Sequence, residues 1–433
     1  MQGSFQPTMG RAPVTTGVTG ALRTPDRLGG SAGTRARKLD QGLAWLLQRT
    51  VGPAGVRVEL WDGSSPSTAP ARPVGDMVVR DRGTLLGLIM NPDIWFGEAY
   101  MAGRLHINGP LEPVLEALSG LSLPTGSWRD RLATALAIPN SLAGARRNVH
   151  HHYDLGNDFY ALWLDREMVY TCAFFDHPEV SLEAAQRAKL DRVCRKLRLQ
   201  PGDTVVEAGC GWGALALHMA RHYGVHVTAF NVSGEQLEYA RARAAREHLT
   251  DRVSFVNDDY RNVRGRFDAF VSVGMLEHVG LAHFETLATV LRNSVKREGG
   301  RGLLHFIGRD TPRPLNAWVR RRIFPGAYPP TLAEVTTRIL EPSGMSVLDV
   351  ENLRLHYAKT LSHWSERFAE AGDEVRTMYG EAFRRAWELY LAGSEAAFAT
   401  GWVQLFQVVF APREAKPPFW TRDELSDQSR GGA

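Results

Sequence analysis

Val205-Val206-Glu207-Ala208-Gly209-Cys210-Gly211-Trp212-Gly213 joins a short β-branched run to three glycines at alternate positions. An amphipathic segment follows at once, with apolar residues at 214, 215, 217, 219 and 220. This order predicts a strand that turns sharply into a helix, where the glycines let a ligand approach the backbone. A purely structural strand–turn–helix is the alternative. The G-x-G-x-G spacing differs from the G-x-G-x-x-G of dinucleotide binders, so the rest of the chain must decide the cofactor.

Strands and helices alternate after this segment. Apolar residues at 190, 193, 194 and 197 predict a preceding helix over 183–197. The predicted strands are 204–207, 225–230, 253–256, 269–273 and 302–307, with helices near 214–223, 234–247 and 281–296. Two further strands, 346–350 and 403–410, flank a helical insertion at about 359–398. The pattern predicts an α/β fold with a doubly wound, mostly parallel sheet of seven strands.

The composition of the chain divides it into five segments. A basic tail without apolar periodicity is expected to be disordered, and it precedes a small α+β domain that carries apolar runs near 56–61 and 77–79. A linker with a seam at 124–127 leads to the catalytic domain, and a flexible tail follows. The predicted bounds are 1–38 for the basic tail, 39–122 for the α+β domain, 123–147 for the linker and its helix, 148–415 for the catalytic domain and 416–433 for the C-terminal tail.

Composition restricts the classes of function. The 433 residues carry a formal charge of +4, which suits an anionic partner such as a membrane or a nucleic acid without deciding between them. Three cysteines, Cys172, Cys194 and Cys210, are too few and too irregular for a disulfide framework, so a reducing, cytoplasmic setting is expected. No apolar run is long enough to span a bilayer and no signal peptide follows Met1. Any contact with lipid is therefore expected at the membrane surface.

Polar residues follow the second and third strands of the predicted sheet, where a bound ligand is expected. Asn231 stands where a nicotinamide-binding enzyme usually has a carboxylate for the ribose. This disfavours a nicotinamide-dependent reductase, which remains an alternative from another class. S-adenosylmethionine (SAM) has no pyrophosphate and carries a sulfonium, so it needs polar contacts more than a phosphate cradle. A non-catalytic lipid-binding module is the third alternative.

Seven motifs occur in order between residues 148 and 410. Two of them are Tyr170-Thr171-Cys172-Ala173-Phe174-Phe175 and Gly274-Met275-Leu276-Glu277-His278-Val279-Gly280. The others are 149–160, 304–308, 323–326, 355–361 and 404–410. Together they resemble the cyclopropane-fatty-acid synthases and mycolic acid methyltransferases, and the glycine loop resembles motif I of SAM methyltransferases. The segment 96–101 resembles part of the extra N-terminal domain of the phospholipid-acting synthases, which implies that the domain 39–122 associates with lipid or substrate.

The resemblance implies a class I SAM-methyltransferase fold, Rossmann-like, with SAM at the strand ends. Three departures from the family pattern are Thr171 for Ser, Asn231 for Thr and Ala327 for Gly. The first two keep a hydrogen-bonding group, so SAM binding is still expected. The residues predicted around SAM, from the resemblance and from the strand ends, are Tyr170, Thr171, Glu207, Gly209, Gly211, Gly213, Asn231, Val232, Gln236, Asp259, Tyr260 and Arg261. For Glu207, a structural role is equally open.

The implied reaction is methyl transfer from SAM to the cis double bond of an unsaturated phospholipid acyl chain. It leaves a carbocation, and loss of a proton from the new methyl group closes a cyclopropane ring. Water would quench the cation, so the base must lie in an apolar pocket. The family is understood to use a bicarbonate ion, which the resemblance places among Cys172, Glu277, His305, the backbone of Ile307 and Tyr357. N–H and O–H donors suit an oxyanion, and Glu277 can orient it if the two share a proton.

The product and the partners are less closely defined. A methylene- or methyl-branched chain would follow from the same first step with a different proton loss. The aromatic and basic run 318–324 is either a solvated basic face or a membrane-contacting surface, and the implied substrate favours the second. Peripheral association at the inner face of the membrane is therefore predicted. No nucleic-acid partner is predicted, and a homodimer is only a family expectation. No metal is predicted either, because three consecutive histidines at 150–152 rarely converge on one ion.

Overall fold

The computed structural model describes residues 35–121, 155–417 and 419–422. The predicted linker and its helix, most of the basic tail and the histidine run at 150–152 therefore lie outside the described residues. A seven-stranded sheet forms the larger unit, in the order β6-β5-β4-β7-β8-β10-β9. Its strands are β4 Thr204–Ala208, β5 His226–Asn231, β6 Val253–Asn257, β7 Ala269–Val273, β8 Arg301–Gly308, β9 Met345–Asn352 and β10 Gln404–Pro412. The predicted α/β fold class and the strand positions are confirmed.

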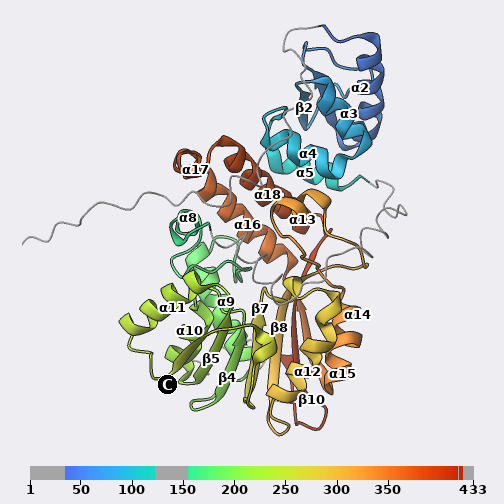
Figure 1. Cartoon of the computed structure of the whole chain (residues 1–433). Coiled ribbons are helices and arrows are strands. Elements are labelled where there is room, and N and C mark those ends of the chain that lie inside the picture. Colours follow the sequence, from blue (N-terminus) through green and yellow to red (C-terminus); the bar gives the residue numbers. More distant parts are fainter. Residues whose placement is uncertain (1–34, 122–154, 418, 423–433) are drawn as a thin grey trace, which may run out of the picture.

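The sheet is parallel from β6 to β8, and β10 runs antiparallel between β8 and β9. Successive strand residues point to opposite faces. Val205 and Val271 accordingly belong to one buried cluster with the helices α9 to α11, whereas Val206 and Phe270 belong to another with α12. These helices are α9 Leu182–Lys196, α10 Ala214–Tyr223, α11 Gly234–Arg246 and α12 Phe284–Ser294. Figure 1 shows the two helical layers on either side of the sheet.

The N-terminal unit has its own sheet and core. Strands β1 Val56–Leu60 and β2 Gly75–Val79 pair in parallel, and β3 Leu105–Asn108 pairs antiparallel with β2. Its helices are α2 Lys38–Val51, α3 Arg82–Met90, α4 Pro92–Met101 and α5 Leu111–Ser119. Val56, Val58 and Leu85 are fully buried in its hydrophobic cluster. An apolar core of its own makes this unit a compact body within the chain.

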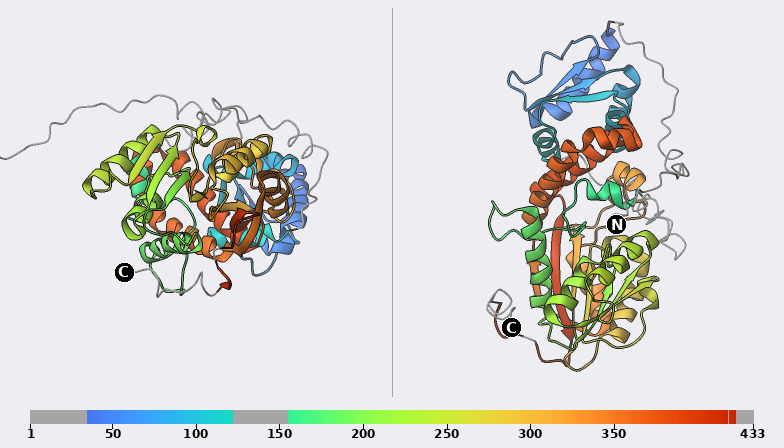
Figure 2. Two further views of the ribbon diagram at one scale, coloured as in Figure 1. Left: turned by 90° about the horizontal axis from the view of Figure 1, so that it is seen from below. Right: turned by 90° about the vertical axis from the view of Figure 1, so that its left-hand side faces the viewer.

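The helical insertion lies between the two units (Figures 1 and 2). It consists of α16 Arg354–Glu370, α17 Gly372–Tyr379 and α18 Glu381–Ala399, and it begins five residues before the predicted residue 359. The guanidinium of Arg385 on α18 donates to the backbone oxygens of Tyr100 and Leu105, at 2.6 and 3.0 Å. These bonds fix the N-terminal unit to the inserted helices. No helix of the described residues combines the length and hydropathy needed to cross a bilayer.

The run 318–324 forms a second joint between the units. Trp318 on α13 (Ala317–Arg322) is buried so closely against Gly97 of α4 that a Cβ at Gly97 would lie 2.3 Å from the indole. Arg322 donates to both carboxylate oxygens of Glu98, at 2.6 and 2.7 Å. Ile323 is buried as well. The interpretation of this run as a membrane-contacting surface is therefore wrong for these side chains, because they pack against another part of the chain.

Candidate functional site

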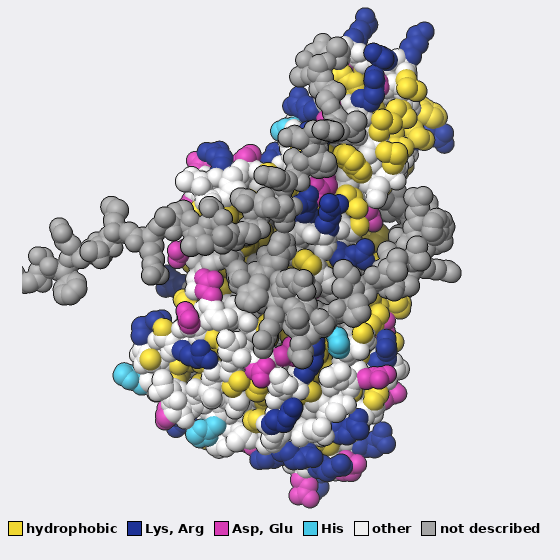
Figure 3. Space-filling view, viewed as in Figure 1, with side chains coloured by type: hydrophobic (Ala, Val, Ile, Leu, Met, Phe, Trp, Pro, Cys, Tyr) yellow, Lys and Arg dark blue, Asp and Glu magenta, His cyan; other side chains and the backbone are white. Residues whose placement is uncertain are grey.

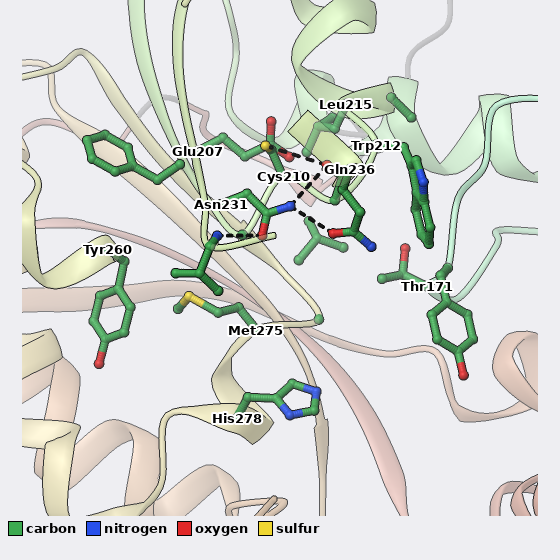
Figure 4. Close-up of a pocket in the computed structure, with 18 of the residues that line it drawn as sticks. Thr171, Glu207, Cys210, Trp212, Leu215, Asn231, Gln236, Tyr260, Met275 and His278 are labelled. Atoms are coloured by element: carbon green, nitrogen blue, oxygen red, sulfur yellow. Dashed lines mark hydrogen bonds between the residues drawn. The ribbon is translucent and has the colours of Figure 1, made fainter. Parts of the chain in front are cut away.

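A cavity opens at the carboxyl ends of β4 to β7 (Figure 4). All but one of the twelve residues predicted around SAM line it, and they come from the glycine loop, the strand ends and the segment before α9. The lining residues that were predicted are Tyr170, Thr171, Glu207, Gly209, Gly211, Asn231, Val232, Gln236, Asp259, Tyr260 and Arg261. The lining residues that the prediction missed include Met168, Lys189, Trp212, Asp258, Met275, His278 and Pro325.

The glycine loop leaves room for a ligand at its centre. The backbone N–H groups of Gly209 and Cys210 donate to the carbonyl oxygen of Phe230, at 2.9 and 3.0 Å, so the loop is tied to the end of β5. Gly211 has a positive φ of 52°, and a Cβ built there would meet nothing within 4 Å. The absence of a side chain therefore keeps the floor of the cavity open at this position.

Gly213 is the predicted residue that does not line the cavity. It has a φ of 83°, and a Cβ there would lie 2.8 Å from the ring of Phe255 and 2.9 Å from Ala240. The cofactor contact of Gly213 stays a prediction, because its Cβ position faces Phe255 and Ala240 and the residue does not line the cavity. This glycine lets α10 begin close against β6 and α11, which is the packing role that the third glycine of such loops serves.

Asn231 connects three parts of the cavity wall (Figure 4). Its amide nitrogen donates to the carbonyl oxygen of Gly211 at 3.2 Å and to the side chain of Gln236 at 2.8 Å. Its amide oxygen accepts the backbone N–H of Val232 at 2.8 Å. A carboxylate could not donate these two bonds. The amide that disfavoured a nicotinamide cofactor thus also holds the glycine loop in place.

Lys189 is a buried cation that the sequence analysis did not name. It lies on the buried face of α9, only 2% exposed, and its ammonium donates to the hydroxyl of Thr171 at 2.8 Å. Burial lowers the pKa of Lys189 to about 8 and raises the pKa of Glu207 to about 8. One carboxylate oxygen of Glu207 has no protein partner although it is buried. In the apolar cavity, Lys189 can therefore donate hydrogen bonds as a cation, and the partnerless carboxylate oxygen of Glu207 can accept one.

We expect Lys189→Met to weaken SAM binding about tenfold, because a hydrogen bond to a charged group contributes about 1.5 kcal/mol or more. Met has a similar length and is uncharged, so the helix keeps its packing while the Thr171 hydroxyl loses its donor. Calorimetric titration with SAM measures the effect. Arg187 is an exposed cation on the same helix that does not line the cavity, so the control variant Arg187→Met should bind SAM as the wild type does. An unchanged affinity in Lys189→Met would contradict this role.

A second group of predicted residues lies at the end of β8. The carboxylate of Glu277 accepts the backbone N–H of Ile307 at 2.5 Å. His305 precedes Ile307 by two residues on β8, so both side chains point to the same face of the sheet. Glu277 Oε2 and His305 Nε2 are buried and have no protein partner. The N–H of Ile307, predicted to be one of the groups that hold the anion, thus donates to Glu277 in this structure.

Gln407 fixes the proton on His305. Its side-chain Nε2 lies 3.0 Å from His305 Nδ1, across the antiparallel pair of β10 and β8. An amide NH₂ can only donate, so Nδ1 accepts and a neutral ring carries its proton on Nε2. Burial holds the pKa of His305 well below its ordinary value, which keeps the ring neutral. His305 therefore directs a single N–H donor from the end of β8.

Contacts with the backbone of Leu353 connect Cys172 and Tyr357 to this group. The Cys172 thiol donates to the carbonyl oxygen of Ala173 at 3.1 Å and lies 3.9 Å from that of Leu353. The same Leu353 oxygen accepts the N–H of Tyr357, and the N–H of Leu353 donates to Leu405, which pairs with Ile307 across the sheet. Burial raises the pKa of the Cys172 thiol, so it stays protonated. Neither residue lines the cofactor cavity.

The structure thus separates two sets of residues. One lines the cofactor cavity and the other, with Cys172, Glu277, His305, Ile307 and Tyr357, lies beside it at the end of β8 and against α16. Burial raises the pKa of Glu277 to about 7, so this carboxyl can hold or release a proton near neutral pH. Among the described residues, no three His, Cys, Asp or Glu side chains gather as a metal site would require.

The chain matches the family model described as "Mycolic acid cyclopropane synthetase" over residues 140–408, which is more than half of its length. The chain belongs to this cyclopropane synthase family. A "Probable fatty acid methyltransferase" of Pseudomonas putida is 37% identical over 383 residues, covering 86% of this chain and 96% of the relative. The "Cyclopropane-fatty-acyl-phospholipid synthase" of Escherichia coli K12 is 35% identical over 367 residues, covering 83% of this chain and 90% of the relative.

A solved cyclopropane synthase supports the cofactor. The mycolic acid cyclopropane synthase CmaA1, crystallised with SAH and CTAB, is 29% identical to this chain with a TM-score of 0.57. The match covers 61% of this chain and 97% of that structure. This member of the cyclopropane synthase family is accordingly a SAM-dependent methyltransferase, as the motifs predicted. Residues 45–121 match a family model described as a domain of unknown function, and that description assigns no role to the N-terminal unit.

Proposed function

We propose that the protein transfers a methyl group from SAM to the cis double bond of an unsaturated acyl chain of a membrane phospholipid and closes a cyclopropane ring. The observation that carries the proposal is the pair of partnerless buried atoms, Glu277 Oε2 and His305 Nε2, beside the cavity that SAM suits. Buried polar atoms are rarely left unpaired. The homology to a phospholipid-acting synthase supports the choice of substrate.

The donor set fits a bound bicarbonate. The His305 Nε2–H is a donor for an oxyanion, and a protonated Glu277 can share its proton with one. Glu277 in its ionised form would repel the anion, but its raised pKa of about 7 makes the neutral form available. Cys172, His305, Glu277 and Tyr357 would hold the anion, with Ile307 positioning Glu277. When bound, SAM would supply the electrophilic methyl group and bicarbonate the base for the final proton.

The surrounding residues would exclude water from the reaction. Trp163 and Trp364 are fully buried, with ring centroids 5.6 Å apart. The ring of Tyr357 lies 4.5 Å from that of Phe398 and 6.0 Å from that of Trp364. These aromatic side chains form an apolar environment around Cys172 and Tyr357. A carbocation on the lipid would survive there long enough to lose a proton.

Lipid analysis of a host expressing the chain tests the proposed product. A cyclopropane ring resonance, together with a mass gain of one CH₂ per acyl chain, is the expected result. An exocyclic methylene or a methyl-branched alkene, each formed when the cation loses a different proton, would instead establish the second candidate, a branched-chain product. The similarity to a relative named as a fatty acid methyltransferase, without mention of cyclopropane, favours keeping that candidate.

We expect Cys172→Ala and Tyr357→Phe each to lower turnover while SAM affinity stays close to that of the wild type. Each variant removes a single polar group, a thiol or a hydroxyl, next to the proposed anion and leaves the cofactor cavity intact, so a loss of about tenfold or more is expected. Steady-state turnover on dispersed phospholipid and titration with SAM give the two quantities. As a control, Cys194→Ala removes an equally buried thiol on α9 that is outside this group. If either variant bound SAM more weakly but turned over bound SAM at the wild-type rate, the assignment of Cys172 and Tyr357 to the anion site would be contradicted.

A further inference from the structure

The N-terminal unit exposes a group of large apolar side chains on two adjacent helices. Leu39, Trp45 and Leu46 on α2 are 70, 41 and 46% exposed, and Leu86 and Met90 on α3 are 36 and 69% exposed. We call these five residues the α2–α3 patch. In Figure 3, hydrophobic side chains gather on the face over α2, with Lys and Arg at the rim. A contiguous apolar surface with a polar rim marks a site of interaction.

The two helices are held together as one face. The guanidinium of Arg82, at the start of α3, donates to both carboxylate oxygens of Asp40 on α2, at 2.6 Å each. Asp40 is fully buried, and the pairing lowers its pKa. The patch is therefore a fixed surface rather than two independent helices.

The exposed charges on these helices are all basic. Four exposed cations lie on α2 or just before it, namely Arg35, Arg37, Lys38 and Arg49. The only acid on α2 and α3 is Asp40, which is buried and paired with Arg82. The guanidinium of Arg49 lies 4.9 Å from the centre of the Trp45 ring, so cation and indole present one amphipathic unit. Asp62 also lies beside this segment, where its carboxylate accepts the backbone N–H of Ala36.

We propose that the α2–α3 patch docks the enzyme on an anionic phospholipid surface. The proposal rests on the proposed function, because it names the face by which the enzyme meets its lipid. Exposed Leu, Met and Trp side chains can enter the interfacial layer, and the basic rim pairs with anionic head groups. A second copy of the chain suits the patch less well, since a two-fold contact would bring the same basic residues together. The run 318–324 packs against α4 of the N-terminal unit and does not cover the α2–α3 patch.

Flotation of the full-length protein with vesicles tests the docking face. The vesicles contain either equal parts of phosphatidylglycerol and phosphatidylcholine or phosphatidylcholine alone. We expect the triple variant Leu39→Gln, Leu46→Gln and Met90→Gln to lose about tenfold in binding to the mixed vesicles. The double variant Lys38→Glu and Arg49→Glu should lose a similar factor on mixed vesicles and much less on phosphatidylcholine, with the difference disappearing at high salt.

The matched control is Met378→Gln with Val347→Thr, which replaces 41 and 38% exposed apolar residues of the catalytic unit. This control should bind vesicles as the wild type does. Wild-type vesicle binding by the triple variant would overturn the proposal. So would a changed molar mass in light scattering without a loss of vesicle binding, because the patch would then contact a second copy.

Turnover on detergent-dispersed unsaturated phospholipid separates this proposal from the proposed function. The triple variant should keep wild-type SAM affinity and wild-type turnover on the dispersed lipid, and lose turnover only on vesicles. If the triple variant also lost turnover on dispersed lipid, the patch would serve folding or catalysis and the docking proposal would be overturned. If the wild type consumed SAM with no lipid at all, the proposed function would fail, and flotation would still decide the docking face.

Discussion

Glu277→Ala is expected to lower methyl transfer by about 10²- to 10³-fold, the loss typical when one group that stabilises an oxyanion is removed. The variant removes both the acceptor for the Ile307 N–H and the partnerless oxygen beside the proposed anion. SAM affinity should change little, because Glu277 does not line the cofactor cavity. Stopped-time turnover assays and SAM titration measure the two effects. A variant that bound SAM poorly and turned over bound SAM normally would disprove this role.

The Glu277→Gln variant distinguishes the protonation state. An amide has the shape of a protonated carboxyl, so the variant should keep more activity than Glu277→Ala. Burial raises the pKa of Glu277 to about 7, so the neutral carboxyl is the main form below that pH and is lost above it. At saturating bicarbonate, the ratio of wild-type to Glu277→Gln turnover should therefore fall as the pH rises through about 7. A ratio that rises with pH would show that the ionised carboxylate is the active form.

His305→Phe is the second variant for which we expect a large loss, also about 10²-fold or more. Phenylalanine fills the space of the ring in this fully enclosed position but offers no donor to an anion. His305→Gln keeps an N–H group and should recover part of the rate. Both variants should bind SAM as the wild type does, since His305 does not line the cofactor cavity. Full activity in His305→Phe would show that the imidazole takes no part in the reaction.

Gln407→Leu isolates the positioning of His305. Leucine leaves the imidazole in place but removes the donor to Nδ1, so the ring is free to carry its proton on either nitrogen. We expect a smaller loss than in His305→Phe, about tenfold, with the same SAM affinity. The nitrogen-15 shifts of the ring would show a single Nε2–H tautomer in the wild type and a mixture in Gln407→Leu. An unchanged tautomer would show that another group fixes the proton.

The central strands of the catalytic unit were predictable because each is a short, largely apolar run next to a glycine or a polar turn. Val205 and Val206 precede the glycine loop, and the burial of both faces of the sheet makes such runs continuously apolar. The strand β3 was missed because Leu105–Asn108 has only two apolar residues. It is an edge strand of a small sheet, where pairing with β2 rather than side-chain pattern determines the structure.

The cofactor residues were more predictable than the residues that support them. The glycine loop follows β4, Asn231 ends β5 and Tyr260 comes three residues after β6, so their position at one edge of the sheet follows from the topology. Lys189 was missed although it lies on the buried face of α9 with Ala185, Gln186 and Leu190. The buried face of a helix is usually predicted from its apolar residues alone, so a lysine on that face is overlooked. A lysine on such a face is the signal that would have found it. Gln407 could not be found this way, since its importance depends on the register of β10 against β8.

The side chains of Trp318, Arg322 and Ile323 were misinterpreted for a related reason. Aromatic residues next to three arginines are typical of a membrane-facing surface and of a contact between domains alike. Only the partner distinguishes them, and that partner is Gly97 and Glu98, more than two hundred residues earlier in the chain. Five of the ten large apolar side chains that are exposed in the described part of the chain lie on α2 and α3 instead.

The joint between α13 and α4 has a mechanical consequence. Pro325, which lines the cofactor cavity, follows the Arg322–Glu98 ion pair by three residues. A tilt of the N-terminal unit that keeps this pair and the contact of Trp318 with Gly97 would therefore move α13, which ends three residues before Pro325. The dimensions of the cofactor cavity are thus linked to the orientation of a unit that contributes no residue to it. A force that a lipid surface exerts on α2 and α3 would therefore be transmitted through α13 to the cavity where SAM binds and SAH leaves.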